Sequence, residues 1–434
     1  MIRLFFNVTT RGLYENDRMR KIPMILTLAL TSACQQAPEW PGSLETLLAS
    51  HSDTFGTVIN NPEKYRVQIL YTQIDRDADN QPHFRTYSYG VDPRRYFYPA
   101  STVKLPTVAL ALEKLHHVNQ PGLNRDTTML TGSAADYQTA VSEDQTSPTG
   151  LPSVAHYARK ILLVSDNDAF NRLYEFVGQK TINEAMRNKG YIDTRIVHRL
   201  ESALSKGQNQ WTNPVSFVKG DEVIYTQDDT HNDIDFYGKQ PELMGVAEIV
   251  DGVRIDRPKD FSGKNAYPLL DQHGVIKNLL FPQSVKEEKR FDLDDDDYRF
   301  LYRYMSMYPG ESDIETYQDQ DRYPPGYVKF LMYGGNAKEI PPHIRIFNKV
   351  GDAYGFLTDA AYIVDFKNQV EFILSATIYT NENQTFNDNK YEYDEIGLPF
   401  LKNLGQLIYQ VELNRPREHK PDLSRFVFAD RKGE

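Results

Sequence analysis

Ser101 and Lys104 lie three residues apart in the run Pro99-Ala100-Ser101-Thr102-Val103-Lys104, and the strongly apolar stretch 108–112 follows them. The pattern predicts a helix over about 101–117. Residues i and i+3 share one face of a helix, so a neutral Lys104 amine can lie beside the hydroxyl and accept its proton. This spacing indicates a serine nucleophile with an adjacent base. Taken alone, the pair is also typical of a helix cap followed by a surface lysine.

Two further motifs carry groups that handle protons and bind substrates. Ser165-Asp166-Asn167 offers a second hydroxyl that can relay a proton and an amide that can contact a substrate. Lys349-Val350-Gly351 ends a predicted strand, where the lysine supplies a fixed positive charge and the glycine permits close approach of a backbone. Each triplet is weak evidence by itself, because each also fits an ordinary helix start or strand end.

The three motifs in this order resemble the pattern of the penicillin-recognising serine enzymes, and their surroundings resemble class A β-lactamases in particular. Arg199-Leu200-Glu201, with Leu204 following, is similar to the Ω-loop of that family. Glu201 stands 36 residues after Ser165, as in the family. The resemblance covers about 56–207 and 291–415.

The resemblance implies a role for each matching residue and requires neither a metal nor another cofactor. Ser101 is expected to be the nucleophile, Lys104 its base partner, Ser165 the proton relay, Asn167 a substrate contact, Glu201 the hydrolytic base and Lys349 the charge that faces an anion. The backbone N–H groups of Ser101 and Asp352 are expected to form the oxyanion hole, with Gly351 beside the substrate.

Three residues depart from the family pattern. Ser205 stands where an asparagine usually helps the glutamate to hold water, which predicts slow deacylation. Val350 replaces a hydroxyl residue that binds the β-lactam carboxylate, a loss of about 1.5–3 kcal/mol for a hydrogen bond to a charged group. Asp352 adds a negative charge nearby. These departures leave the acylation groups intact and put the β-lactam substrate in doubt.

Composition excludes several classes of protein. The chain has 434 residues and a formal net charge of −11, which argues against a nucleic-acid partner. A single cysteine excludes an intramolecular disulfide and a cysteine-ligated metal site. We interpret the acidic run Asp294–Asp297 as a solvated helix start rather than a metal site.

The amino-terminal segment resembles a bacterial lipoprotein signal. A basic start precedes the apolar run 22–33, which is too short to span a bilayer, and small residues then precede Cys34, the only cysteine. We expect residues 1–33 to be a signal peptide region, with a translation start at Met19 favoured. Cys34 is then lipidated, and residues 34–55 form a tether and the start of the first helix. The alternative is a buried amphipathic element with an inert cysteine.

The predicted elements run from strands through a helical block and back to strands. We expect helices over about 44–49, 101–117, 153–177, 182–189, 298–307 and 396–411, and strands over about 65–74, 83–89, 344–349, 360–365 and 370–379, the last two joined by a hairpin. This order, with the resemblance, implies an α/β (α+β) fold of the β-lactamase/DD-peptidase type over 56–434. A five-stranded antiparallel sheet is flanked by helices, an all-helical subdomain carries Ser165, and a loop-rich insertion over about 208–290 covers the mouth of the cleft.

We therefore expect a monomeric, lipid-anchored serine hydrolase of the bacterial cell envelope, facing the periplasm, with the outer membrane preferred. Its expected reaction is β-lactamase-type amide hydrolysis through an acyl-enzyme on Ser101. One alternative is a D-alanyl peptidase or another amidase or esterase that acts on cell-wall peptides. Another is a binding protein that has kept the scaffold and lost catalysis.

Overall fold

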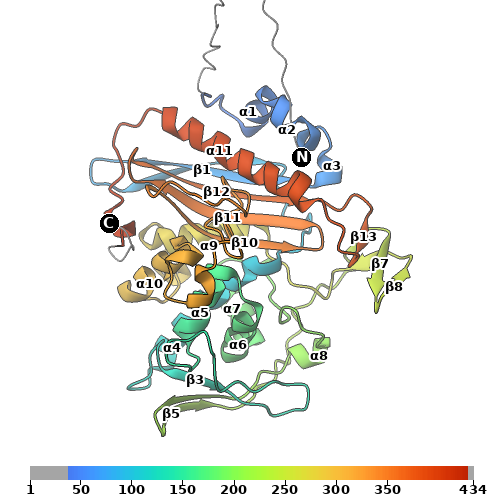
Figure 1. Cartoon of the computed structure of the whole chain (residues 1–434), viewed down its shortest axis with the longest axis vertical. Helices are drawn as coiled ribbons and strands as arrows, with labels where there is room; N and C mark the ends of the chain where they lie inside the picture. Colours follow the sequence, from blue (N-terminus) through green and yellow to red (C-terminus); the bar gives the residue numbers. More distant parts are fainter. Residues whose placement is uncertain (1–37, 429–434) are drawn as a thin grey trace, which may run out of the picture. The chain divides into compact units, whose positions relative to one another are not determined.

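A computed structural model describes residues 38–428, and its centre is a five-stranded antiparallel sheet (Figure 1). The strand order is β10-β11-β12-β1-β2, so strands from opposite ends of the chain pair side by side, as predicted. The predicted hairpin is confirmed, since Asp365 pairs with Val370 across it. The five strands are β1 (Gln68–Arg76), β2 (Pro82–Tyr89), β10 (Ile344–Ala353), β11 (Phe356–Asp365) and β12 (Val370–Tyr379).

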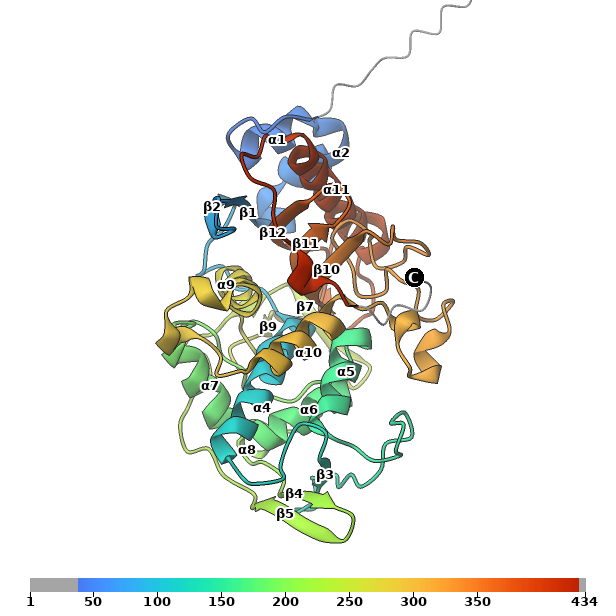
Figure 2. The same ribbon diagram turned by 90° about the vertical axis from the view of Figure 1, so that its left-hand side faces the viewer.

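Helices cover both faces of this sheet (Figures 1 and 2). α11 packs against β12 on one face, where α1 and α2 join it, and α9 packs against β1, β11 and β12 on the other. Both faces are therefore apolar, and β11 and β12 are buried along their whole lengths. The helices are α1 (Leu44–Ser50), α2 (Ser52–Ile59), α3 (Pro62–Tyr65), α9 (Leu269–Leu280), α10 (Asp295–Ser306) and α11 (Leu398–Asn414).

A group of helices between β2 and the Ω-loop carries the first motifs. A short 3₁₀ turn, η1 (Ala100–Val103), leads into α4, and α4 packs against α5 and α6. The single helix predicted over 153–177 is wrong, because the chain breaks at Ser165, whose φ is +60°. This break places Ser165 at a junction between two helices. The helices are α4 (Lys104–Val118), α5 (Val154–Val164), α6 (Asn167–Val177) and α7 (Gln179–Asn188).

The segment predicted as a loop-rich insertion, 208–290, contains more regular structure than expected. Its last part forms α9, whose apolar face packs on the central sheet, so this part belongs to the core. The rest forms short strands, and a hairpin of β4 and β5 pairs with β3. The small elements are β3 (Thr128–Thr131), α8 (Lys206–Asn209), β4 (Val215–Lys219), β5 (Glu222–Gln227), β6 (Leu243–Met244), β7 (Ala247–Val250), β8 (Val253–Ile255), β9 (Lys259–Asp260) and β13 (Thr385–Phe386).

The predicted signal segment and the lipidation site at Cys34 lie outside the described residues. Among residues 38–428, no helix combines the length and the apolar character that a membrane span needs.

Candidate active site

Ser101 lies on the tight turn η1, immediately before α4. The turn begins at Ala100, which has a φ of +46°, a conformation that costs a residue with a Cβ some energy. Ser101 is partly exposed, whereas Lys104 is buried at the first position of α4. The predicted pair therefore consists of a reachable hydroxyl and a buried amine at the same end of one helix.

The Lys104 amine contacts the second motif. Lys104 Nζ lies 2.5 Å from the Ser165 carbonyl oxygen, 3.3 Å from Ser165 Oγ and 2.5 Å from Asn167 Oδ1. Burial lowers the pKa of Lys104 well below the ordinary lysine value, and the charge of Lys349 lowers it further. Burial therefore favours the neutral amine, which is the form that a general base requires.

Lys349 brings the third motif to the same hydroxyl. Lys349 Nζ donates to Ser165 Oγ at 2.7 Å and to the Val350 carbonyl oxygen at 3.0 Å. Burial lowers the pKa of Lys349 to about 7, while Asp352 and Asp359 act in the opposite direction. The Ser165 hydroxyl thus lies between two lysines that come from different parts of the chain.

Gly351 allows β10 to approach the nucleophile turn. A Cβ on Gly351 would lie 2.5 Å from the Pro99 carbonyl oxygen and 3.0 Å from the backbone nitrogen of Ser101. The first distance is shorter than real Cβ atoms show, so any other residue would force the backbone to shift. The end of β10 is therefore packed directly against the backbone that carries Ser101.

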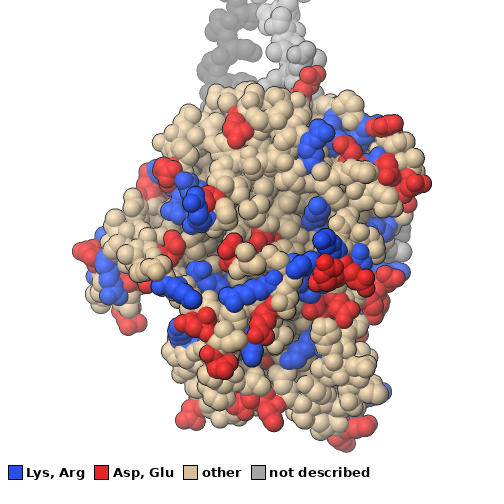
Figure 3. Space-filling model, turned by 180° about the vertical axis from the view of Figure 1, so that it is seen from behind, with Lys and Arg blue, Asp and Glu red and all other residues tan. Residues whose placement is uncertain are grey.

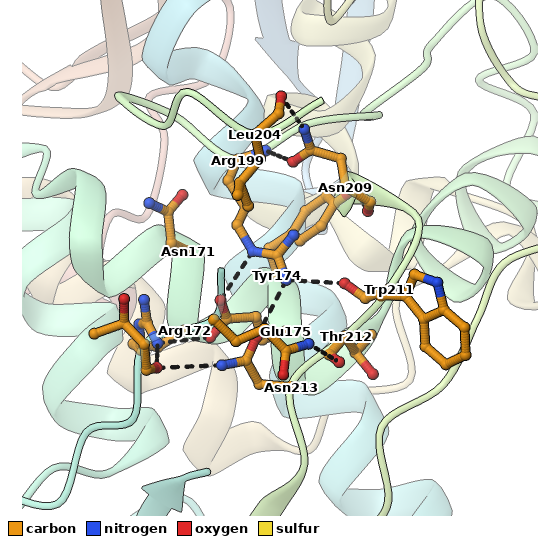
Figure 4. A network of polar contacts seen from close by, with 12 residues as sticks. Asn171, Arg172, Tyr174, Glu175, Arg199, Leu204, Asn209, Trp211, Thr212 and Asn213 are labelled. Carbon is orange, nitrogen blue, oxygen red and sulfur yellow. Dashed lines mark hydrogen bonds and ion pairs between the residues drawn. The ribbon is translucent and has the colours of Figure 1, made fainter. Parts of the chain in front are cut away.

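The Ω-loop is fixed to α6 by buried polar contacts (Figure 4). Arg199 Nε donates to Glu175 at 2.8 Å, and Arg199 Nη2 donates to the Trp211 carbonyl oxygen at 2.9 Å. The Asn171 side chain exchanges two hydrogen bonds with the backbone of Leu200, at 2.9 and 3.0 Å. The residue just before Glu201 is consequently held in place from α6.

Glu201 itself is exposed. Its φ is +48°, and its carboxylate forms no hydrogen bond with any residue in 38–428. Its charge nevertheless acts on Lys104 and Asp352, so it lies at the border of the site. Ser205 caps α8, since its Oγ accepts from the Gln208 backbone at 3.3 Å. The Ser205 hydroxyl is therefore used in a helix cap.

Val350 points away from the lysines. Successive side chains of a strand alternate between faces, and Val350 is buried on the α11 face of the sheet, opposite to Lys349. Phe330 and Leu331 belong to the same apolar cluster. They come from residues 307–343, a segment that contains none of the predicted motifs.

A buried polar network anchors that segment beside β10. Lys329 Nζ donates to Asn348 Oδ1 at 2.7 Å, and Asn348 Nδ2 donates to Asp359 Oδ1 at 2.8 Å. Asp359 also accepts from the Phe330 and Leu331 backbone at 3.2 and 3.0 Å. The signal in the sequence was Asn348, a polar residue next to Lys349 in the predicted strand.

The acidic run at the start of α10 acts as a helix cap. Asp294 Oδ1 accepts from the Asp297 backbone at 2.8 Å, which confirms the predicted helix start. The prediction that the run is solvated is wrong for Asp297, which is buried. Asp294, Asp297 and His116 lie close enough to share a metal ion, but Asp297 is already bound to Arg125 at 3.0 Å and to His116 at 2.5 Å. We therefore assign these carboxylates to structural contacts.

Residues 53–233 match the model of the β-lactamase enzyme family, a range that contains Ser101, Lys104, Ser165 and Glu201. The resemblance to the penicillin-recognising serine enzymes is confirmed. No curated protein matches the chain. Similar solved structures include a β-lactamase from Sphaerobacter thermophilus DSM 20745 (13% identity, TM-score 0.47, 86% of this chain and 98% of that chain). Another is PBP-A (14% identity, TM-score 0.48, 86% of this chain and 97% of that chain).

Proposed function

We propose that this chain is a serine hydrolase that forms an acyl-enzyme on Ser101, with β-lactamase-type amide hydrolysis as its reaction. One observation carries the proposal. The Ser165 hydroxyl is within reach of two buried lysines, 2.7 Å from Lys349 Nζ and 3.3 Å from Lys104 Nζ, next to the turn that exposes Ser101. Burying two amines costs free energy, because it removes their charged forms from water. Lysines whose pKa is lowered in this way concentrate at functional sites.

In the proposed acylation, Ser101 Oγ bonds to the carbonyl carbon of the substrate and the carbon–nitrogen bond breaks. The hydroxyl proton passes to the Lys104 amine and then through Ser165 Oγ to the departing nitrogen. The protonated Lys349 stabilises the relay by donating to Ser165 Oγ. The backbone N–H groups of Ser101 and Asp352 donate to the oxyanion, each contributing about 3–4 kcal/mol in comparable sites.

The geometry around Glu201 favours slow release of the acyl group. Hydrolysis needs a base that holds a water molecule against the ester, and the exposed Glu201 carboxylate has no hydrogen bond to residues in 38–428. Ser205 is committed to the cap of α8. A penicillin-binding enzyme whose acyl-enzyme persists, such as a D-alanyl peptidase, is therefore the second candidate.

Intact-protein mass spectrometry tests both candidates. The purified protein and its Ser101→Ala variant are incubated with a penicillin and with a cephalosporin, and the mass is followed over hours. We expect a mass increase equal to the whole β-lactam that depends on Ser101. An adduct that decays supports the hydrolase, and an adduct that persists supports the second candidate. The proposal would be overturned if Ser101 formed no adduct with the penicillin, with the cephalosporin or with a neutral fluorophosphonate.

A further inference from the structure

The chain that leads to Glu201 is held residue by residue along its backbone. Each backbone N–H group from residue 195 to residue 200 donates to an oxygen atom outside this stretch, over 2.7–3.1 Å. Glu201 is the next residue, so these contacts fix the point at which its side chain leaves the backbone. In the order of the donors, the accepting oxygens belong to Ala266, Asn183, Asn265 (twice), Asn209 and Asn171.

Asn265 supports the middle of this stretch from the loop between β9 and α9, outside the three motifs. Its Oδ1 accepts from the backbone N–H groups of Val197 at 2.7 Å and His198 at 3.1 Å, and its Nδ2 donates to the His198 carbonyl oxygen at 3.3 Å. Asn265 has no exposed surface, and within residues 38–428 all hydrogen bonds of its side chain go to the stretch 195–200. A buried amide whose polar atoms are paired in this way makes the backbone that it contacts rigid.

Asn265 is also connected to the chain that carries the nucleophile. The Tyr96 hydroxyl donates to the backbone carbonyl oxygen of Asn265 at 2.9 Å, and Tyr96 lies five residues before Ser101. The Tyr96 ring also packs against Phe261, which belongs to the same loop as Asn265, with ring centres 5.6 Å apart. Asn265 therefore joins the stretch 195–200 to the segment that leads into the nucleophile turn.

We propose that Asn265 is a positioning residue for hydrolysis of the acyl-enzyme, because it holds the backbone before Glu201 at a fixed place relative to Ser101. The inference rests on the proposed acyl-enzyme at Ser101 and specifies what supports its second step. In that step the Glu201 carboxylate takes a proton from water as the water oxygen bonds to the acyl carbon. The bond from that carbon to Ser101 Oγ then breaks, and the proton passes from Glu201 to Ser101 Oγ. Acylation uses Lys104 instead, so removal of the Asn265 side chain is expected to slow hydrolysis selectively.

Asn265→Ala tests this role with benzylpenicillin as the probe. The intact mass of the protein gives the rate at which the adduct forms and, once free penicillin is removed, the rate at which the adduct is lost. We expect the loss to slow by about tenfold and the formation to change by less than about twofold, because displacing a base slows the step that uses it. Asn278→Ala is the matched control. Asn278 is 1% exposed and donates to the Lys289 carbonyl oxygen at 2.8 Å and to the Tyr191 hydroxyl at 3.2 Å, so both rates are expected to stay natural.

Hydroxylamine distinguishes the positioning of a base from general damage to the site. Its nitrogen bonds to the acyl carbon, the bond to Ser101 Oγ breaks, and a nitrogen proton passes to that oxygen. Hydroxylamine is a stronger nucleophile than water and does not need Glu201 as a base. We expect Asn265→Ala and Glu201→Gln to show the same pattern, with slow loss of the adduct in water and near-natural loss in hydroxylamine. Tyr96→Phe removes the hydrogen bond to the Asn265 carbonyl oxygen and keeps the ring, so it takes the place of Asn265→Ala if that variant does not fold.

The positioning role would be overturned by natural loss of the adduct in Asn265→Ala, or by equal slowing of its loss in water and in hydroxylamine. A natural adduct that does not decay, or one whose loss Glu201→Gln does not slow, would also overturn it. In each of these cases an adduct on Ser101 has formed, so the proposed acyl-enzyme stands. If Ser101 reacts with no β-lactam but with a fluorophosphonate, only the positioning role falls. If Ser101 reacts with none of these probes, both proposals fall.

Discussion

At the scale of single residues, the two lysines beside Ser165 have different proposed roles. Lys104 is the base, and Lys349 is the charged donor to Ser165. Lys104 has no exposed surface and lies near a second positive charge, so the neutral amine is favoured there. Lys349 is also buried, but Asp352 and Asp359 favour its charged form. The sequence predicted both residues and not this difference, because burial and neighbouring charges depend on segments far away in the chain.

Lys349→Arg tests the charge of that residue through the pH dependence of acylation. The pKa of Lys349 is about 7, so the ammonium that donates to Ser165 is lost as the pH rises through about 7. We expect kcat/KM to fall above that pH in the natural protein. An arginine stays charged, so the variant is expected to lack this decline up to about pH 9, at a lower overall rate. The measurement is kcat/KM with the methyl 2-mercaptoacetate thioester of benzoylglycine, a neutral substrate whose loss of thioester absorbance is followed between about pH 5 and 9.

Lys277→Arg is the matched control. Burial lowers the pKa of Lys277 as well, but the residue lies on α9 over the ring of Phe84, away from Ser165. Its substitution is expected to leave the pH profile unchanged. A decline that persists in Lys349→Arg would assign the titration to another group.

At the scale of elements, strong periodicity predicted most of the sheet. The strand ending at Tyr379 and the Asp365–Val370 hairpin stand where the β-branched and aromatic pattern placed them. The break at Ser165 was missed because the apolar spacing continues on both sides of it. The helix α9 was missed because its charged and polar residues obscure the apolar face that the sheet covers. Both errors arose where tertiary packing, rather than local pattern, determines the structure.

Gly351→Ala tests the approach of β10 to the nucleophile turn. The new methyl group would lie 2.5 Å from the Pro99 carbonyl oxygen, so β10 or the turn must shift. Overpacking of this kind costs about 1–3 kcal/mol. A displacement of about 1 Å at reacting groups can cost about a hundredfold in rate, so we expect a loss of that size in acylation with the fold retained.

Gly263→Ala provides the comparison for that variant. A Cβ at Gly263 meets nothing within 4 Å, and the residue is exposed. It is expected to acylate at the natural rate and to melt at the natural temperature. If Gly351→Ala also kept the natural rate of labelling, close packing of β10 on Ser101 would not be required for the chemistry.

At the scale of the whole molecule, charge and packing act differently. The net charge of −11 is unevenly distributed, because Lys and Arg form a band across the face shown in Figure 3 while Asp and Glu gather beside it. The electrostatic field at the site is therefore determined by the nearest charged groups and not by the net charge.

Packing, in contrast, links distant segments. Phe261, from the segment after the Ω-loop, contacts Tyr98 and Tyr354, with ring centres 6.2 and 5.4 Å apart. Tyr98 precedes Ser101 by three residues, and Tyr354 follows Asp352 by two.

Phe261→Ala tests whether this segment supports the site as well as the fold. Phe261 has no exposed surface, so its truncation is expected to cost about 3–5 kcal/mol and to lower the melting temperature by about 5–10 °C. The same ring packs against Tyr98 and Tyr354, which lie close in sequence to Ser101 and Asp352. We therefore also expect acylation of Ser101 to slow by about tenfold at temperatures where the variant is folded. Val253→Ala, at a residue 60% exposed on β8, should change neither quantity. Calorimetry and timed labelling with a fluorophosphonate separate the two effects. A variant that melts early but labels at the natural rate would limit this segment to a role in stability.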